Sequence, residues 1–364
     1  MRAVVIFVFT AAMLFAQTRR VTDAEVRRVH GSALLIDTHN DIATEEAGVD
    51  HTGPFDIGAR LPKAHTDLTR LREGGVGAVF FAAWVASSYA APGNRAFNRA
   101  QEVIDTIRRD IVERYPKDFA LATTADEIEA AHKQGKIAAL IGVEGGHAIE
   151  DSLDHLRELY ARGVRYMTLT HTNTNNWADS SGDVNDAAIQ HHNGLTPFGK
   201  DVVREMNRLG MMVDISHVAD KTFWDALEVS RAPLIASHSD CRALANVPRN
   251  MTDEMIVALA KKGGVIQVNF YCNFLNTQKP PHATIDDVVA HIDHIRKIVG
   301  IDAIGIGSDF DGIECAPVGL EDVSKFPNLT RALLERGYSA ADIRKIYGAN
   351  FLRVMRAVEK ASGK

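Results

Sequence analysis

Apolar residues gather in eight short runs along this chain, each rich in Val, Ile, Ala and Leu and without polar alternation. Such runs are typical of strands buried on both faces, as in a parallel sheet. The predicted strands cover residues 33–38, 76–85, 137–143, 164–170, 211–216, 232–237, 263–270 and 303–308. Between them lie longer stretches with the apolar spacing of helices, for example SLDHLRELYARG and TPFGKDVVREMNRLG. The pattern therefore predicts strands and helices in alternation.

A glycine follows five of the predicted helices, just before the next strand begins. Glycine adopts the left-handed conformation that ends a helix and starts the loop into a strand. These glycines are Gly135, Gly163, Gly210, Gly263 and Gly300. Eight strands, seven helical regions between them and a closing helix over 340–359 predict an α/β fold, a (β/α)8 TIM barrel. An open doubly wound sheet is the alternative, but no glycine-rich phosphate loop follows a strand.

The composition is that of an ordinary globular protein, with 364 residues of which 46% are hydrophobic and 24% are charged. Barrels of this kind often use such a length as one domain, and no repeat or proline-rich linker divides the chain. Residues 20–364 are therefore predicted to form a single barrel domain. A net charge of -6 and the lack of Lys/Arg-rich runs argue against a nucleic-acid partner.

The first 19 residues are predicted to be a secretory signal peptide. Arg2 gives a positive start, residues 4–15 are apolar, and Ala16-Gln17 offers a cleavage point. The apolar stretch is too short to span a bilayer comfortably, although an uncleaved membrane anchor is the alternative. We expect an exported protein, periplasmic or secreted, with no stable membrane span once the signal is removed.

Three cysteines, Cys241, Cys272 and Cys315, lie in the exported portion. An odd number cannot all pair within one chain, and none has the spacing of a zinc finger. One disulfide can form in an oxidising compartment, but the sequence leaves open which pair forms it.

Side chains that can bind metals stand at the ends of several predicted strands. They are His39 and Asp41 in LLIDTHND, Glu144 in IAALIGVEGG, His217 in MMVDISH and His238 in APLIASHS. Barrel active sites form where the carboxyl ends of the strands meet, so these side chains are expected to converge. His39 and Asp41 share a face and can bind one ion, while His217 and His238 can bind a second. Glu144 has two oxygens and can bridge both ions.

This ligand count predicts two metal ions. A catalytic zinc site typically has three protein ligands and a position left for water. Five ligands with one shared carboxylate give three for each ion, so we expect two zinc ions bridged by Glu144 and a hydroxide. Three imidazoles favour zinc, although Mn²⁺, Co²⁺ and Fe²⁺ stay open.

Three more residues complete the expected chemistry. His171 ends the run VRYMTLTH and could donate a hydrogen bond to a developing oxyanion. Asp309, in IGIGSDFDG, could carry a proton from the attacking water to the leaving amine. Arg249, eleven residues after His238, could bind a substrate carboxylate.

Each of these residues also has a plainer interpretation. Single histidines are more often core side chains than ligands, Glu144 could pair with Arg165, and Arg249 could form a surface ion pair. His291 and His294, on a predicted helix, are expected at the surface.

The motifs DTHND, GVEGGHAI, TLTHTNTN, DISHVAD, SHSDCRAL, NVPRNMTDE, VNFY and GSDFDG resemble those of the membrane dipeptidase (renal dipeptidase) family. The likeness runs from about residue 33 to 355 in the family's motif order. This family belongs to the amidohydrolase superfamily of metal-dependent (β/α)8 barrels. The resemblance implies a binuclear zinc enzyme that cleaves dipeptides, including those with a C-terminal D-residue.

Carried onto this chain, the resemblance gives each residue a role. His39 and Asp41 correspond to ligands of the first zinc, His217 and His238 to ligands of the second, and Glu144 to the bridge. His171 corresponds to the group that polarises the scissile carbonyl and Asp309 to the acid/base. Arg249 and Tyr271 correspond to contacts of the substrate carboxylate. The resemblance also implies a homodimer. Mammalian members carry a lipid-anchor signal at the C-terminus, but the tail MRAVEKASGK is polar, so we expect no such anchor here.

Two other functions stay open at this point. One is a different amidohydrolase reaction, on a lactam, a lactone or an N-acyl amino acid. The other is a binding protein that keeps the metal site but has lost catalysis, against which the presence of Asp309 argues.

Overall fold

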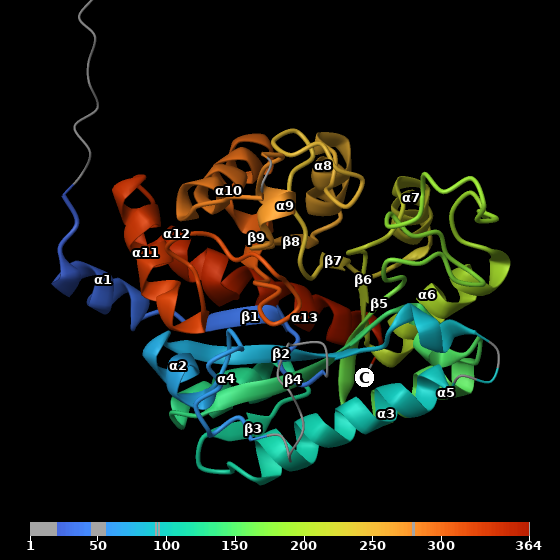
Figure 1. Cartoon of the computed structure of the whole chain (residues 1–364), viewed down its shortest axis with the longest axis horizontal. Coiled ribbons are helices and arrows are strands. Elements are labelled where there is room, and N and C mark those ends of the chain that lie inside the picture. Colours follow the sequence, from blue (N-terminus) through green and yellow to red (C-terminus); the bar gives the residue numbers. More distant parts are fainter. Residues whose placement is uncertain (1–19, 45–55, 92, 94, 279–280, 364) are drawn as a thin grey trace, which may run out of the picture.

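The computed structural model describes residues 20–44, 56–91, 93, 95–278 and 281–363, and its strands form a closed parallel barrel (Figure 1). The barrel strands are β1 (Leu35–Asn40), β2 (Val76–Trp84), β4 (Ile137–Glu144), β5 (Val164–Thr168), β6 (Met212–Asp214), β7 (Ile235–Ala236), β8 (Val265–Val268) and β9 (Ile304–Ile306). They pair in the order β2-β1-β9-β8-β7-β6-β5-β4, and β2 also pairs with β4. Because this last pairing closes the ring, the predicted (β/α)8 barrel is confirmed and the open-sheet alternative is wrong.

A ninth strand, β3 (Phe119–Leu121), is absent from the sequence-based prediction. It pairs in parallel with the first residues of β4, with Phe119 opposite Ile137 and Leu121 opposite Ala139. The same part of β4 also pairs with β2, so β3 flanks the ring beside β4. Three residues are too few to show a period, which explains why the strand was missed.

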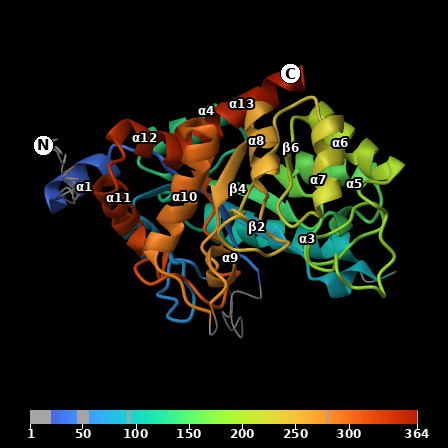
Figure 2. The ribbon, with the colours of Figure 1, turned by 90° about the horizontal axis from the view of Figure 1, so that it is seen from above.

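Helices surround the strands, as the view from above shows (Figure 2). They are α1 (Asp23–His30), α2 (Leu68–Glu73), α3 (Ala96–Asp105), α4 (Ala125–Lys133), α5 (Leu153–Ala161), α6 (Pro197–Leu209), α7 (Asp220–Val229), α8 (Asp253–Lys261), α9 (Cys272–Leu275), α10 (Ile285–Val299), α11 (Phe326–Glu335), α12 (Ala340–Arg344) and α13 (Asn350–Ala361). Among the described residues, no helix is both long and apolar enough to cross a bilayer. The predicted signal peptide, residues 1–19, lies outside the described residues.

The five predicted helix-ending glycines all adopt the left-handed conformation, with φ from 71° at Gly135 to 107° at Gly163. Each therefore stands where the chain leaves a helix and turns back into the barrel. The predicted closing helix is also present, but it has three parts. A π-helical turn over Lys345–Ala349 joins α12 to α13.

A column of aromatic rings runs through the barrel interior from α13 to the end of β1. The ring of Phe351 on α13 lies 5.4 Å from that of Phe80 on β2, measured between centroids. Phe80 in turn lies 5.0 Å from Tyr166 on β5. The Tyr166 hydroxyl then meets Nδ1 of His39 at 2.8 Å. Because interiors pack densely and these residues are buried, the column fixes the height and orientation of His39.

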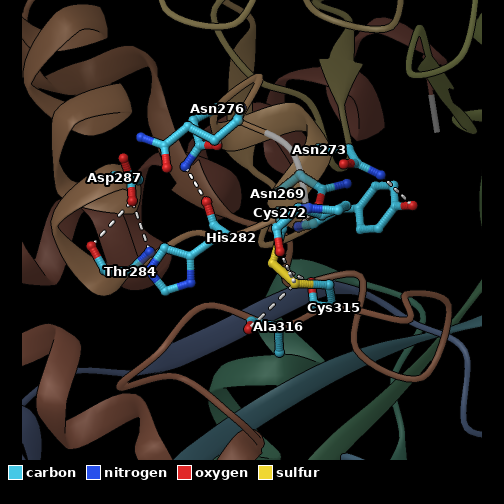
Figure 3. The surroundings of a disulfide bond; sticks show 12 residues. Asn269, Cys272, Asn273, Asn276, His282, Thr284, Asp287, Cys315 and Ala316 are labelled. Carbon is cyan, nitrogen blue, oxygen red and sulfur yellow. Dashed lines mark hydrogen bonds between the residues drawn. A yellow bond between two sulfur atoms is a disulfide. The ribbon is translucent and has the colours of Figure 1, made fainter.

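The structure also identifies the paired cysteines. Cys272, at the start of α9, forms a disulfide with Cys315 in the segment after β9 (Figure 3). Cys241 is free and buried. The disulfide therefore joins the two segments that follow β8 and β9, next to the carboxyl end of the barrel.

Candidate metal centre

His39 and Asp41 lie at the carboxyl end of β1, and both side chains are buried. His39 Nε2 is 3.3 Å from Asp41 Oδ2. Tyr166 donates its hydroxyl proton to the Thr38 carbonyl at 3.2 Å. It therefore accepts from Nδ1–H of His39, which leaves Nε2 of His39 with its lone pair toward the site.

Glu144, the last residue of β4, lies between His39 of β1 and the two histidines that follow β6 and β7. Its Oε1 is 3.0 Å from His217 Nε2 and 3.2 Å from His238 Nε2. Its Oε2 is 3.4 Å from His39 Nε2. One carboxylate thus faces His39 with one oxygen and the histidines after β6 and β7 with the other, which is the arrangement a bridging ligand needs.

His217 and His238 follow β6 and β7, and their Nε2 atoms are 2.9 Å apart. Ser237 donates its hydroxyl proton to Asp214 Oδ2 at 2.6 Å and contacts Nδ1 of His238 at 2.8 Å. Nδ1 of His238 therefore carries the proton, and its Nε2 is free to bind a metal. Burial lowers the pKa of both His217 and His238 well below the ordinary value, so both imidazoles are neutral, as metal ligands must be.

The backbone at this site adopts a conformation that side chains other than glycine rarely take. His217 has φ of 65° and Asp309 has φ of 63°. Such strain is concentrated at functional sites, where the surrounding structure holds it in place. Gly312 lies so close that a Cβ atom there would come within 2.5 Å of Asp41 Oδ2.

These residues fit a metal. Nε2 of His39 and Oδ2 of Asp41 are buried and have no hydrogen-bond partner, which is costly unless a cation satisfies them. Three groups of ligand atoms each lie within 4.8 Å of one another: His39 with Glu144 and His238, Glu144 with His171 and His217, and His39 with Asp41 and Asp309. Burial lowers the pKa of His39, but its neighbours Tyr166, Glu144 and Asp41 raise it well above the ordinary value. The same surroundings would stabilise a metal cation.

Asp309 follows β9 and faces the same centre. Its Oδ1 is 3.9 Å from His39 Nε2, and its Oδ2 accepts a hydrogen bond from the Asn269 amide at 2.8 Å. Burial raises the pKa of Asp309 to about 7. A carboxyl group with a pKa near neutrality can both accept and release a proton there.

A cavity of about 540 Å³ opens over these residues and is lined on its walls by Trp84, His171, Tyr271, Phe274 and Glu314, among others. His171 is half-buried, with Nε2 3.8 Å from Glu144 Oε1. Its ring meets that of Trp84 edge to face at 5.5 Å. Pockets of this size hold small molecules, and a dipeptide fits the range.

Arg249 and Tyr271 lie beside this cavity. Arg249 donates to Ser239 Oγ and to the His238 carbonyl, both at 2.6 Å, and its guanidinium lies 5.4 Å from the ring of Phe274. Its Nε is buried and has no partner. Tyr271 accepts a hydrogen bond from the Asn273 amide at 2.7 Å. Only Tyr271 of the two lines the cavity among the described residues.

A family model for membrane dipeptidases (peptidase family M19) matches residues 23–364. The chain belongs to this family. The resemblance drawn from its motifs is thus confirmed, and the family supports a metal-dependent dipeptidase.

Several solved structures of other proteins resemble the whole fold. A probable dipeptidase, PvdM, from Pseudomonas aeruginosa is 26% identical with a TM-score of 0.81, over 93% of this chain and 98% of that one. An amidohydrolase from the same organism is 27% identical with a TM-score of 0.76, over 92% and 98%. A metallopeptidase from Rhodobacter sphaeroides, bound to a phosphinate mimic of the dipeptide L-Ala-D-Ala, is 27% identical with a TM-score of 0.77, over 90% and 99%.

The sequence did not predict the residues that orient the candidate ligands from outside the cavity. Tyr166, Asp214 and Ser237 orient the candidate ligands, and Asn269 holds Asp309. Asn269 did carry a signal, because it is a polar residue at the carboxyl end of a predicted strand. Tyr166 carried none, since an aromatic residue inside a strand is normally core.

Proposed function

We propose that this protein is an exported, zinc-dependent dipeptidase. The placement of Glu144 between His39 on one side and His217 and His238 on the other carries the proposal. Four buried ligand side chains lie around the Glu144 carboxylate, and the five residues together would hold two ions with Glu144 shared between them. The imidazoles favour zinc over harder metals.

Two zinc ions at this centre would supply a nucleophile from water at neutral pH and polarise the scissile carbonyl. The chain's own residues would stabilise the developing charge and transfer the proton. His171, on the cavity wall, donates a hydrogen bond to the carbonyl oxygen as negative charge develops on it. Asp309 accepts the proton of the attacking water and delivers it to the leaving amine, while Asn269 keeps one of its oxygens fixed.

Substrate selection follows from the carboxylate end of the dipeptide. Arg249 and Tyr271 bind this group, which restricts hydrolysis to the bond one residue before the C-terminus. The Rhodobacter sphaeroides structure, with its mimic of L-Ala-D-Ala, supports a dipeptide substrate and tolerance for a C-terminal D-residue. A dipeptide amide should therefore be a poor substrate, whereas an enzyme acting on lactams or lactones would not need a free carboxylate.

The test is amino-acid release from L-Ala-D-Ala by the zinc-loaded protein, with and without a chelator. Release that stops with the chelator and returns with zinc supports the proposal. A protein that binds zinc but releases nothing from L-Ala-D-Ala or L-Ala-L-Ala points to the other amide and lactone substrates. A silent binding protein would release nothing from any of them.

Export and assembly are proposals from the sequence. Residues 1–19 would direct the chain across a membrane and be removed, so the remaining barrel would act as a periplasmic or secreted enzyme. A homodimer is expected from the family resemblance, and its size in solution tests that.

A further inference from the structure

The Glu314 carboxylate lies on the cavity wall next to Tyr271, the tyrosine proposed to bind the substrate carboxylate. Glu314 and Tyr271 both line the cavity, and the Glu314 side chain is exposed to it. Among the described residues, no Lys, Arg or His pairs with Glu314, and its neighbour on this wall is the Tyr271 hydroxyl, which hydrogen-bonds to it. An exposed carboxylate in a substrate cavity that has no cationic partner of its own can pair with a positive charge on the substrate.

The disulfide fixes how these two residues lie relative to one another. Cys272 and Cys315 are the next residues after Tyr271 and Glu314, and the bond holds their Cα atoms 5.6 Å apart. The Cys272 N–H also donates to the Cys315 carbonyl at 3.2 Å. Figure 3 shows the two cysteines joined with Asn269 beside them. The two loops therefore form one wall of the cavity, and the disulfide keeps the backbone of Glu314 close to that of Tyr271.

The side chains of Glu314 and Tyr271 also interact electrostatically. Burial, and next the negative charge of Glu314, raise the pKa of the Tyr271 phenol. A substrate carboxylate bound at Tyr271 thus sits close to a like charge, which weakens binding of dipeptides with neutral C-terminal side chains. A positive charge on that side chain would reverse this effect, because it would pair with Glu314.

We propose that Glu314 gives the site a preference for dipeptides whose C-terminal residue carries a cationic side chain. This inference rests on the dipeptidase function proposed above. Lys63, on the segment between β1 and β2, also lines the cavity and has the opposite charge. Because the cavity thus carries charges of both signs, the charged side chain must be tested separately at the N-terminal and at the C-terminal residue of the dipeptide.

The test compares kcat/KM for L-Ala-L-Lys with that for L-Ala-L-norleucine, which has nearly the same shape without the charge. We expect the Lys substrate to be preferred about fivefold, the upper end for a partly exposed ion pair. The ratio should fall to about one in Glu314→Gln and shrink between about 0.02 M and about 0.5 M salt. Glu314→Lys should instead favour L-Ala-L-Glu. Glu335→Gln, on α11 outside this cavity, makes the same change in net charge and should leave the ratio unchanged.

Position is tested with L-Lys-L-Ala against L-norleucine-L-Ala, for which no effect of Glu314→Gln is expected. The inference is overturned if wild-type protein shows no preference for L-Ala-L-Lys, if the preference survives Glu314→Gln, or if it resides in the N-terminal residue. In each of those cases dipeptides are still hydrolysed. If none is hydrolysed at all, the proposed function itself fails.

Discussion

The side-chain amide of Asn269 donates a hydrogen bond to Oδ2 of Asp309 at 2.8 Å, across 40 residues of sequence. The other end of the Asn269 amide accepts the backbone N–H of Tyr271 at 2.6 Å. Asn269 is fully buried, so both bonds are made in a low-dielectric interior where they are strong. The Asn269 side chain thus positions both Asp309, the proposed proton carrier, and the backbone at Tyr271.

Replacing Asn269 with Ala should therefore impair the chemical step more than binding. We expect kcat to fall about tenfold or more, because general acid–base catalysis of roughly 10²–10⁴ depends on the placement of the group. KM should change by less. Steady-state kinetics on L-Ala-D-Ala measure both, and Asn328→Ala, which removes an amide that contacts the Gly319 carbonyl, is the matched control. Equal effects in the two variants would show that Asn269 has no special role.

Arg249 is predicted to bind the substrate carboxylate, and its buried Nε without a partner is consistent with a group that awaits one. Arg249→Met keeps most of the stem but removes the charge. We expect KM for dipeptides to rise roughly 10- to 100-fold, as for the loss of a charge-assisted hydrogen bond. Because Arg249 also contacts the His238 carbonyl, the zinc content of the variant must be measured alongside. An unchanged KM with zinc retained would contradict this role.

The Cys272–Cys315 bond closes a loop with a sequence separation of 43. Cross-links of this span stabilise folded proteins by about 2–4 kcal/mol, chiefly by restricting the unfolded chain. The double variant Cys272→Ser, Cys315→Ser should lose that amount of unfolding free energy in a urea titration. Reduction of the wild-type protein should give the same loss, whereas a reductant should leave the unfolding of the double variant unchanged. Stability that does not depend on the reductant in either protein would argue against the disulfide.

His291 was expected at the surface from its place on a predicted helix, and this expectation is wrong. It is fully buried on α10, where Nδ1 accepts the Cys241 N–H at 3.0 Å and Nε2–H donates to the Leu275 carbonyl at 2.9 Å. Helical spacing places it on the inward face, where a neutral imidazole satisfies two backbone groups.

Burial lowers the pKa of His291 to about 4, against an ordinary value near 6.5. Between these two pH values, His291 is therefore protonated in the unfolded chain but neutral in the folded protein. The stability from neutral His291 is fully present above pH 6.5 and is lost as the pH falls from 6.5 through 4, by about 3 kcal/mol in total. Unfolding free energies at pH 7 and pH 4.5 should therefore differ less in His291→Gln than in the wild-type protein. An identical difference in both would show that His291 does not set the acid sensitivity.

The sequence alone predicted what depends on local pattern. All eight barrel strands carry apolar runs, and the glycines at helix ends mark the turns between them, so the closed barrel was predictable. Its parallel strands then brought His39, Glu144, His217 and Asp309 to one end, as expected. Contacts across the barrel were not predictable. Tyr166 reaches His39 across 127 residues of sequence, and only the closed ring brings the two together.

Two zinc ions are proposed to bind around Glu144, and a zinc titration of the metal-free protein would test this. Hydrolysis of L-Ala-D-Ala would be followed as zinc is added, with bound zinc measured at each point. Activity should rise until two zinc ions are bound per chain, and Glu144→Gln should bind fewer. Full activity with no bound metal, or an unchanged zinc content in Glu144→Gln, would contradict this proposal.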